Sequence, residues 1–343
     1  MSKSDIEHSS DSEANGVTAA TAPKPTLWQR FKAHMKKWWW VYLIAFGVIV
    51  LVTVLPIIYV GIPHFASKYI NNYEYDTEGL EITNPRPTAF HVKQKKSLSM
   101  GGGFSGSGYL TAFNASIRTT DTNEEFAIFP VPKIDFSDGA TIEFDTDLDL
   151  TCVECLSKIA VQAATDENFA ILATAHPDLK LSGLPTAHLD IHKTMSMDGY
   201  NVTEFVNEQG SFNVTSLKLL DPPVDGYNFN ATISVRNPTP FSVEMGHVTF
   251  NLTLRGDKLG YVDLPNLKLG SDITDTLVRG QVDKSKLVEE ALLGDGDGAT
   301  VTIGIHGHSC EYNGQDIPYF SAAIRAVSAD AQIDLLKYAS SLL

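Results

Sequence analysis

The apolar segment Trp38–Val60, WWWVYLIAFGVIVLVTVLPIIYV, constrains the chain more than any other feature, because it contains no charged, histidine or amide side chain. A helix needs on the order of 20 apolar residues to cross a bilayer, and this run is long enough. Trp38, Trp39 and Trp40 at one end and Tyr59 at the other suit the half-wet headgroup region. A buried core helix and a cleaved signal peptide fit less well, since the run is long, has no polar side and is followed by no small-x-small cleavage site. The sequence therefore predicts an uncleaved transmembrane helix over residues 38–60.

The charges that flank this segment predict its orientation. Arg30, Lys32, Lys36 and Lys37 precede it, whereas the first basic residue after it is Lys68. Positively charged flanks stay on the cytosolic side of a membrane, so we expect a single-pass type II protein with a cytosolic N-terminus. Lys36 and Lys37 meet the anionic inner leaflet and join the terminal aromatic residues as predicted membrane-interface residues.

All five N-x-S/T sequons follow the apolar segment and none precedes it. Sequons are glycosylated only on the lumenal or extracellular side, so their placement agrees with the predicted orientation. The predicted glycosylation sites are Asn114, Asn201, Asn213, Asn230 and Asn251.

The two sides of the segment differ in composition. Residues 1–26 are rich in Ser, Ala, Asp and Glu, so residues 1–37 are predicted to be a disordered cytosolic tail with a basic end. Residues 38–343 hold 20 of the 26 Lys and Arg residues and 37 of the 41 Asp and Glu residues, a net charge of −17. This excess argues against nucleic acid as a partner, and solubility is the preferred explanation for it. The expected partners are membrane lipid and a lumenal protein or lipid ligand.

The remaining sequence is typical of a mainly β protein. Leu80–Thr83, Thr141–Phe144 and Ala231–Val235 alternate polar with apolar residues, as half-buried strands do. Two short helices are expected, around Glu154–Ala164 and Asp283–Leu293.

Four features recur in the same order along the chain. They are an N-P-x-P sequence, a strand beginning with Phe-Asn, a strand containing proline and a short helix. Two copies of one unit explain this order, so we expect two tandem β-sandwich domains, each with a short helix. The predicted boundaries are a connector at 61–75, a first sandwich at 76–208 and a second at 209–343. The recurring sequences are Asn84–Pro87 with Asn237–Pro240, Phe113–Arg118 with Phe250–Arg255, and Pro130–Ile134 with Leu264–Leu269.

The stretch Ala231–Phe241, followed by Gly246–Leu252, resembles the late-embryogenesis-abundant group 2 (water-stress and hypersensitive response) domain. The whole chain is similar to a fungal family of unknown function that carries such domains behind one N-terminal anchor. The resemblance covers residues 70–330 and implies immunoglobulin- or fibronectin-like sandwiches in a fungal membrane protein, plausibly of the vacuole. That family has no known catalytic residues, so none is carried over. The Gly-rich insert 101–108 and the Cys152/Cys155 pair depart from its pattern.

Two trios of metal-ligating residue types alternate along expected strands, where each trio would share one face. Three such residues on one strand usually form only a solvated face, so no metal or cofactor site is assigned. A metal assay of the protein with His188 and His192 replaced would test the alternative. The trios are His188, Asp190 and His192, and His306, His308 and Cys310.

The three cysteines are Cys152, Cys155 and Cys310. A C-x-x-C sequence serves redox chemistry in a βαβ context, which the pattern here lacks. A structural disulfide or unreactive thiols are therefore favoured, and the pairing stays open. The Gly-rich stretch 100–108 lacks the P-loop and G-x-S-x-G sequences, and Gly294–Gly298 lacks the glutamate of an EF-hand, so both are expected to be turns.

Together these observations favour a non-enzymatic membrane protein whose lumenal sandwiches serve as an interaction or scaffold module. No catalytic residue is predicted. The alternative is lipid or hydrophobic-ligand binding, and a metal-dependent enzyme is the least favoured function. The vacuolar membrane is the expected location, with the cell surface or another endomembrane as alternatives.

Overall fold

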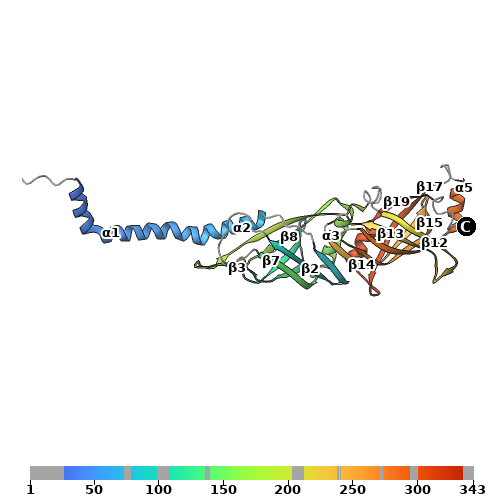
Figure 1. Ribbon diagram of the computed structural model, residues 1–343, viewed down its shortest axis with the longest axis horizontal. Helices are drawn as coiled ribbons and strands as arrows, with labels where there is room; N and C mark the ends of the chain where they lie inside the picture. The colour runs from blue at the N-terminus through green and yellow to red at the C-terminus, as the bar shows by residue number, and fades with distance from the viewer. Residues whose placement is uncertain are drawn as a thin grey trace, which may run out of the picture. The chain divides into compact units, whose positions relative to one another are not determined.

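The structure is a computed structural model of the chain (Figure 1). It describes residues 27–72, 79–98, 108–135, 140–202, 212–237, 239, 241–270, 273–293 and 300–334. Residues 1–26 of the predicted tail, the turn at 294–298, residues 101–107 of the Gly-rich insert and the predicted domain boundary between residues 208 and 209 lie outside the described residues. Contacts divide the chain into two compact units, Met1–Pro56 and Ile57–Leu343, which are taken in turn.

The first unit contributes one described element, the helix α1 (Leu27–Pro56). A π-helical turn η1 (Ile57–Gly61) and the helix α2 (Ile62–Asn72) follow in the second unit. Proline lacks an N–H and crowds the preceding helical turn, and the wider π turn begins directly after Pro56. The predicted segment is helical, and the helical residues Trp38–Asn72, which continue beyond Val60, are long and apolar enough to cross a membrane.

The predicted connector is therefore mostly helical. Ile62, Ala66 and Ile70 of α2 are spaced four residues apart, so they form one stripe on the helix. This stripe packs against a cluster of buried apolar residues that includes Leu110 and Leu189. Hydrophobic contact thus holds α2 onto the β structure that follows it.

The second unit is mainly β, as predicted. Its largest sheet has 11 strands, of which eight follow the order β12-β13-β16-β15-β14-β1-β2-β7. The strand β17 branches from this path by pairing with β14, and β18 and β19 each pair with β17. The strands from the first half of the chain are β1 (Glu81–Arg86), β2 (Ala89–Leu98) and β7 (Ala140–Asp149). Those from the second half are β12 (Phe212–Val224), β13 (Tyr227–Arg236), β14 (Ser242–Leu254), β15 (Asp257–Leu269), β16 (Ile273–Val282), β17 (Thr300–Tyr312), β18 (Gln315–Asp316) and β19 (Ser328–Asp334).

Two smaller sheets, each of four strands, come from the first half alone. Their orders are β10-β9-β3-β6 and β11-β8-β4-β5. The first contains β3 (Gly108–Leu110), β6 (Ile134–Asp135), β9 (Asp178–Leu181) and β10 (Ala187–His188). The second contains β4 (Phe113–Thr119), β5 (Glu125–Val131), β8 (Asn168–Ala175) and β11 (Ile191–Asp198).

Three further helices, α3, α5 and α6, have bounds that lie within the described part of the second unit. The helices α3 (Val153–Thr165) and α5 (Lys284–Leu293) match the two short helices that the sequence predicts. The helix α6 (Pro318–Ala326) is not predicted by the sequence pattern, because its N-cap residue Ile317 makes no side-chain capping bond. Proline at its first position suits a helix start, where an N–H would have no partner.

The two halves of the second unit repeat one pairing scheme. β1-β2-β7 corresponds to β12-β13-β16, and β11-β8-β4-β5 corresponds to β19-β17-β14-β15, all with antiparallel neighbours. The helix comes after the same strand in each half, as α3 after β7 and as α5 after β16. The recurring Phe113 and Phe250 segments lie on the corresponding strands β4 and β14.

The N-P-x-P part of the predicted repeat is wrong. Asn84 lies within β1, where its register with β2 is irregular, whereas Asn237 follows β13, which corresponds to β2. Short proline-containing sequences are common at the ends of strands. Their recurrence therefore does not show that the two segments occupy equivalent positions in the two halves.

The two halves share both a sheet and a core. β1 pairs in parallel with the start of β14, with Glu81 opposite Ser242 and Ile82 opposite Val243. Ile317 and Tyr319 of the second half are buried in the same cluster as Phe90 and Val92 of the first. The helices α3 and α6 pack against each other beside this cluster. Residues on both sides of the predicted boundary between residues 208 and 209 therefore share a sheet and a core.

Candidate functional site

The residues predicted to lie at the membrane interface belong to two consecutive helical elements. Trp38, Trp39 and Trp40 lie in α1 and Tyr59 lies in η1, and the side chains of all four are exposed. Lys36 is an exposed residue of α1, and the side chain of Lys37 is outside the described set. Side chains that face lipid must be exposed on the protein surface, as these are. The role of these residues at the lipid headgroups stays a prediction.

The helix α2 is amphipathic beside this apolar segment. Its stripe at Ile62, Ala66 and Ile70 is covered by the β structure, but Phe65 is 73% exposed and Tyr69 is 47% exposed. Aromatic side chains of this kind suit a membrane interface or a protein partner.

The five sequons lie on strands or loops of the second unit. Asn114 on β4 and Asn213 on β12 are exposed, whereas Asn201, Asn230 and Asn251 are half-buried. The exposed pair offers the most room for a glycan.

The first histidine trio is not one cluster. His188 Nδ1 lies 2.6 Å from Asp178 Oδ1, which pairs it with β9 rather than with Asp190. Asp190 Oδ1 lies 3.1 Å from His192 Nε2 and 3.1 Å from His176 Nδ1. The pattern of alternation could not find His176, because it comes from the loop before β9. All of these side chains are well exposed, and no group of three residues among the described ones has the arrangement of a metal site.

The second trio does not share a face, which corrects the expectation from alternation. Between the pairs Thr249–Ser309 and Phe250–Gly307 the register shifts, so that His308 is an extra residue in β17. A bulge of one residue inverts the faces of the side chains beyond it. His306 is consequently exposed, while Cys310 is fully buried.

Cys310 is the free thiol of the described residues. Its Sγ lies 3.3 Å from the carbonyl oxygen of Met245, to which the thiol donates. Burial, with Asp316 and Glu311 nearby, raises the pKa of the Cys310 thiol to about 12. Since the thiolate is the reactive form, we expect this cysteine to be unreactive in the folded protein.

An open cleft of about 540 Å³ lies between β4, β5 and β7. Its apolar lining includes Phe113, Val131 and Phe144. Its polar lining includes Glu143 and Asp145. Its size is within the range of ligand pockets.

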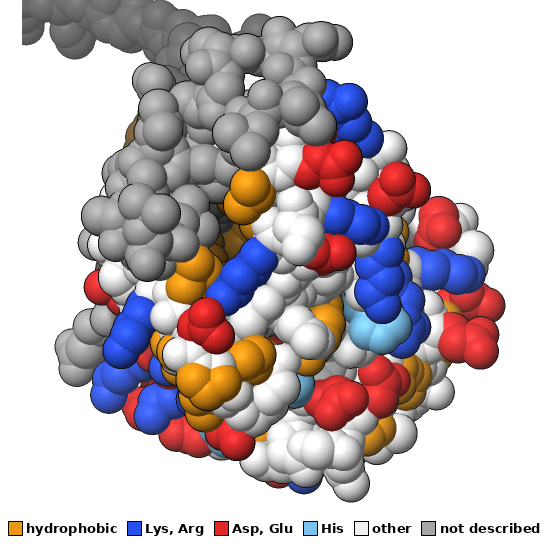
Figure 2. All heavy atoms as spheres, turned by 90° about the vertical axis from the view of Figure 1, so that its right-hand side faces the viewer, with side chains coloured by type: hydrophobic (Ala, Val, Ile, Leu, Met, Phe, Trp, Pro, Cys, Tyr) orange, Lys and Arg blue, Asp and Glu red, His pale blue; other side chains and the backbone are white. Residues whose placement is uncertain are grey.

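β7 also carries a ladder of exposed ion pairs with β2. Lys95 Nζ lies 3.1 Å from Glu143 Oε2, and His91 Nδ1 lies 2.8 Å from Asp147 Oδ1. Hydrogen bonds from His91 and Arg86 lower the pKa of the Asp147 carboxyl. Exposed pairs of this kind add little stability individually, so the ladder mainly neutralises the acidic strand. On the end of the second unit drawn in Figure 2, acidic and basic side chains are likewise interspersed over the described surface.

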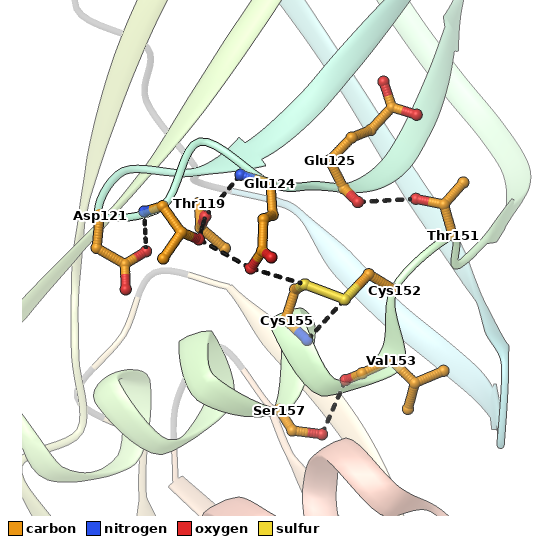
Figure 3. The surroundings of a disulfide bond; sticks show 10 residues. Thr119, Asp121, Glu124, Glu125, Thr151, Cys152, Val153, Cys155 and Ser157 are labelled. Carbon is orange, nitrogen blue, oxygen red and sulfur yellow. Dashed lines mark hydrogen bonds between the residues drawn. A yellow bond between two sulfur atoms is a disulfide. The ribbon is translucent and has the colours of Figure 1, made fainter.

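Cys152 and Cys155 form a disulfide at the start of α3, with their Cα atoms 5.3 Å apart (Figure 3). This agrees with one of the favoured interpretations of the sequence, and it pairs two of the three cysteines. Cys152 is the N-cap of α3, and its Sγ accepts a hydrogen bond of 3.1 Å from the backbone N–H of Cys155.

The loop before β5 lies against this disulfide. Glu124 Oε2 lies 3.6 Å from Cys155 Sγ (Figure 3). The same oxygen accepts a 2.9 Å hydrogen bond from the Thr122 hydroxyl. The backbone N–H of Thr122 donates to Asp121, which lowers the pKa of the Asp121 carboxyl. Sequence reasoning missed Glu124, because it is 31 positions from Cys155 and nothing local links them.

Residues 124–252 match a family model described as "Protein of unknown function (DUF3712)". The matched segment begins at Glu124, includes the disulfide and ends within β14. No curated protein matches the chain. Among solved structures, the secreted serine protease VesC from Vibrio cholerae aligns with 10% identity and a TM-score of 0.17, over 74% of this chain and 53% of the protease. A score this low carries no argument about fold or function.

Proposed function

We propose that this protein is a non-enzymatic, membrane-anchored scaffold whose two β-sandwich halves present one rigid interaction surface. The joint between the halves carries the proposal. The β1–β14 pairing and the insertion of Tyr319 beside Phe90 couple the halves through a sheet and a core. Halves joined by a flexible linker would move independently, whereas a shared core holds binding surfaces on both at a constant separation.

The orientation belongs to the same proposal. The basic residues before Trp38 favour a cytosolic N-terminus, which puts residues 61–343 on the lumenal or extracellular side of a type II protein. The disulfide supports this, since disulfides persist in oxidising compartments. The resemblance to a fungal family with sandwiches of the late-embryogenesis-abundant type supports the vacuolar membrane, with the cell surface or another endomembrane as alternatives.

Proximity labelling in cells tests the scaffold role. A labelling enzyme is fused to the N-terminus or to the C-terminus of the full chain, and each fusion is compared with the same fusion carrying Tyr319→Ala. We expect the C-terminal fusion to label a defined set of lumenal proteins, and this set to shrink when the joint is loosened. The set labelled by the N-terminal fusion serves as the control and should not change. A lumenal set no richer than that of an unrelated anchored protein would contradict the proposal.

Lipid or hydrophobic-ligand binding is the second candidate, and the cleft between β4, β5 and β7 favours it. The apolar lining by Phe113 and Phe144 suits a hydrocarbon chain. Glu143 at the side of the cleft is paired with Lys95, so it sets no preference for the charge of the headgroup. The occupant would be an amphiphile whose hydrocarbon chain fills the cleft.

Mass spectrometry of lipid extracted from the purified full chain tests this candidate. The Phe144→Asp variant places a charge in the cleft, and Ile273→Asp places one on an exposed position of β16. We expect a bound amphiphile in the wild type and in the Ile273 variant, but at least about tenfold less in the Phe144 variant. Equal lipid in all three would mean that it belongs to the detergent-covered helix.

A further inference from the structure

The two sulfur atoms of the Cys152–Cys155 disulfide differ in their surroundings (Figure 3). Cys155 is 3% exposed and belongs to the core cluster around α3 and α6. Cys152 is half-buried at the start of the helix. A thiolate that arrives from solvent therefore reaches the sulfur of Cys152 first.

The helix start favours negative charge on Cys152. The N-terminal N–H groups of a helix and its dipole stabilise an anion, and a thiolate in this position has a depressed pKa. Here the N–H of Cys155 already points at Cys152 Sγ, at 3.1 Å. The helix start therefore stabilises the Cys152 thiolate, both as the leaving group of a mixed disulfide and as a nucleophile.

A proton acceptor lies at the other sulfur. Glu124 Oε2 is 3.6 Å from Cys155 Sγ, and the hydroxyl of Thr122 holds this oxygen at 2.9 Å. In the disulfide, Cys155 carries no proton, so the contact is only a close approach. Once the disulfide opens, the Cys155 thiol becomes a donor to the same oxygen.

The disulfide contributes little as a structural staple. It joins residues three apart in the sequence, and the entropic stabilisation by a disulfide grows with the size of the loop that it closes. The backbone is already held to β5 without it, because the N–H of Thr151 donates to the carbonyl of Phe126 at 2.8 Å. The Thr151 hydroxyl donates to the carbonyl of Glu125 at 3.0 Å (Figure 3). The bond can therefore open without undoing the fold around it.

We propose that Cys152, Cys155 and Glu124 form a thiol–disulfide exchange site whose substrates are cysteine thiols of partner proteins. Cys152 is the sulfur that partners attack, Cys155 is the resolving sulfur and Glu124 takes its proton. This activity is enzymatic, so it replaces the non-enzymatic part of the proposed function while leaving the scaffold role in place, and it rests on its own observations.

Each exchange step conserves electrons. A partner thiolate bonds to Cys152 Sγ, and the Cys152–Cys155 bond breaks with its electron pair on Cys155 Sγ, which takes a proton from water. To release the partner unchanged, Cys155 gives its proton to Glu124, attacks Cys152 Sγ and expels the partner thiolate. If a second partner thiolate attacks the partner's bonded sulfur instead, Cys152 leaves as a thiolate and the partner departs with a disulfide. The partner then has lost two electrons, and a low-molecular-weight disulfide regenerates the site by accepting them.

The first test needs no variant. The full chain in detergent micelles is equilibrated with mixtures of reduced and oxidised glutathione, quenched with acid and alkylated, and the state of Cys152 and Cys155 is read by mass spectrometry. We expect disulfide and dithiol forms to interconvert within minutes, with a glutathione adduct on Cys152 and an unchanged β-sheet circular dichroism spectrum. A disulfide that opens only after denaturant unfolds the protein would overturn the proposal.

Three variants assign the roles. Cys155→Ser should trap the glutathione adduct on Cys152, whereas the matched Cys152→Ser variant should form an adduct at least about tenfold more slowly. Glu124→Gln should slow release of glutathione from Cys152 about tenfold or more and change the pH profile of release, and Glu124→Asp should restore part of the rate. Equal adduct formation in the two cysteine variants, or an unchanged pH profile in Glu124→Gln, would contradict the assigned roles.

Discussion

The hydroxyl of Tyr319 donates to the carbonyl of Ala89 at 3.2 Å, which joins the second half of the β-rich unit to the first across 230 positions of sequence. The same hydroxyl lies 3.2 Å from the carbonyl of Arg86. Burial raises the pKa of the Tyr319 phenol, so it stays protonated and remains a donor. This side chain lies where the two halves share their core.

Tyr319→Phe should lower the free energy of unfolding by about 1 kcal/mol, because the ring still packs but the carbonyls lose their donor. Tyr319→Ala should lower it by about 3–5 kcal/mol, because it also leaves a cavity. All four tryptophans lie between Trp28 and Trp40, so tryptophan fluorescence would not report on this unit. Denaturant unfolding of the full chain is therefore followed by β-sheet circular dichroism.

Tyr261→Phe is the matched control, since it removes a hydroxyl from a half-buried tyrosine of β15, away from the joint. An effect of Tyr319→Ala no larger than that of this control would show that the halves are coupled by the sheet alone.

Gly307→Ala should destabilise the protein by about 3 kcal/mol through overpacking. A Cβ at position 307 would lie 1.7 Å from the carbonyl oxygen of Ile324, so α6 could not keep its place against β17. Thr302→Ala, at an exposed position of the same strand, should change stability by less than about 0.5 kcal/mol. Unfolding midpoints of the two variants check this pair, and a tolerated Gly307→Ala would mean that α6 is not held this tightly.

Cys310 should resist alkylation in the folded protein at neutral and mildly alkaline pH. Its pKa of about 12 leaves almost no thiolate there, and its burial excludes the reagent. Mass spectrometry should find it unmodified after treatment of the native chain and fully modified in denaturant. Rapid labelling of native Cys310 would show that β17 opens readily.

Two arginines in the apolar helix should prevent membrane insertion. Ile49→Arg together with Val52→Arg costs roughly 3 kcal/mol for each charge near the bilayer centre. Alkaline carbonate extraction should move this variant from the membrane pellet to the supernatant, whereas Ile49→Leu with Val52→Leu should stay in the pellet. Retention of the arginine variant in the pellet would mean that another segment holds the protein.

Glycosylation should be strongest at the exposed sequons. Asn114→Gln and Asn213→Gln should each increase gel mobility by one glycan step, and endoglycosidase should abolish the difference from the wild type. Ser116→Thr keeps the Asn114 sequon intact and is the matched control. A wild-type chain that endoglycosidase does not shift would argue against a lumenal β-rich unit.

Much of the fold follows from local patterns. The apolar run predicts the long helix, alternation predicts a mainly β chain, and the ranges expected for the two short helices match α3 and α5 to within a residue or two. The helix α6 escapes this reasoning, since it is short and begins without a capping side chain. The candidate site is predictable only in part. The C-x-x-C sequence can be recognised directly, but nothing in the sequence shows that Glu124 lies close to Cys155.

The sequence by itself determined the membrane-length helix, the β-rich class and the positions of the cysteines and sequons, because these depend on residues close together in the chain. Tertiary structure alone decided which strands meet, that Tyr319 lies beside Ala89 and that Glu124 lies beside Cys155. It also decided that one extra residue at His308 turns Cys310 into the core while His306 stays exposed. Such contacts depend on register and on packing between distant segments, for which local periodicity carries no information.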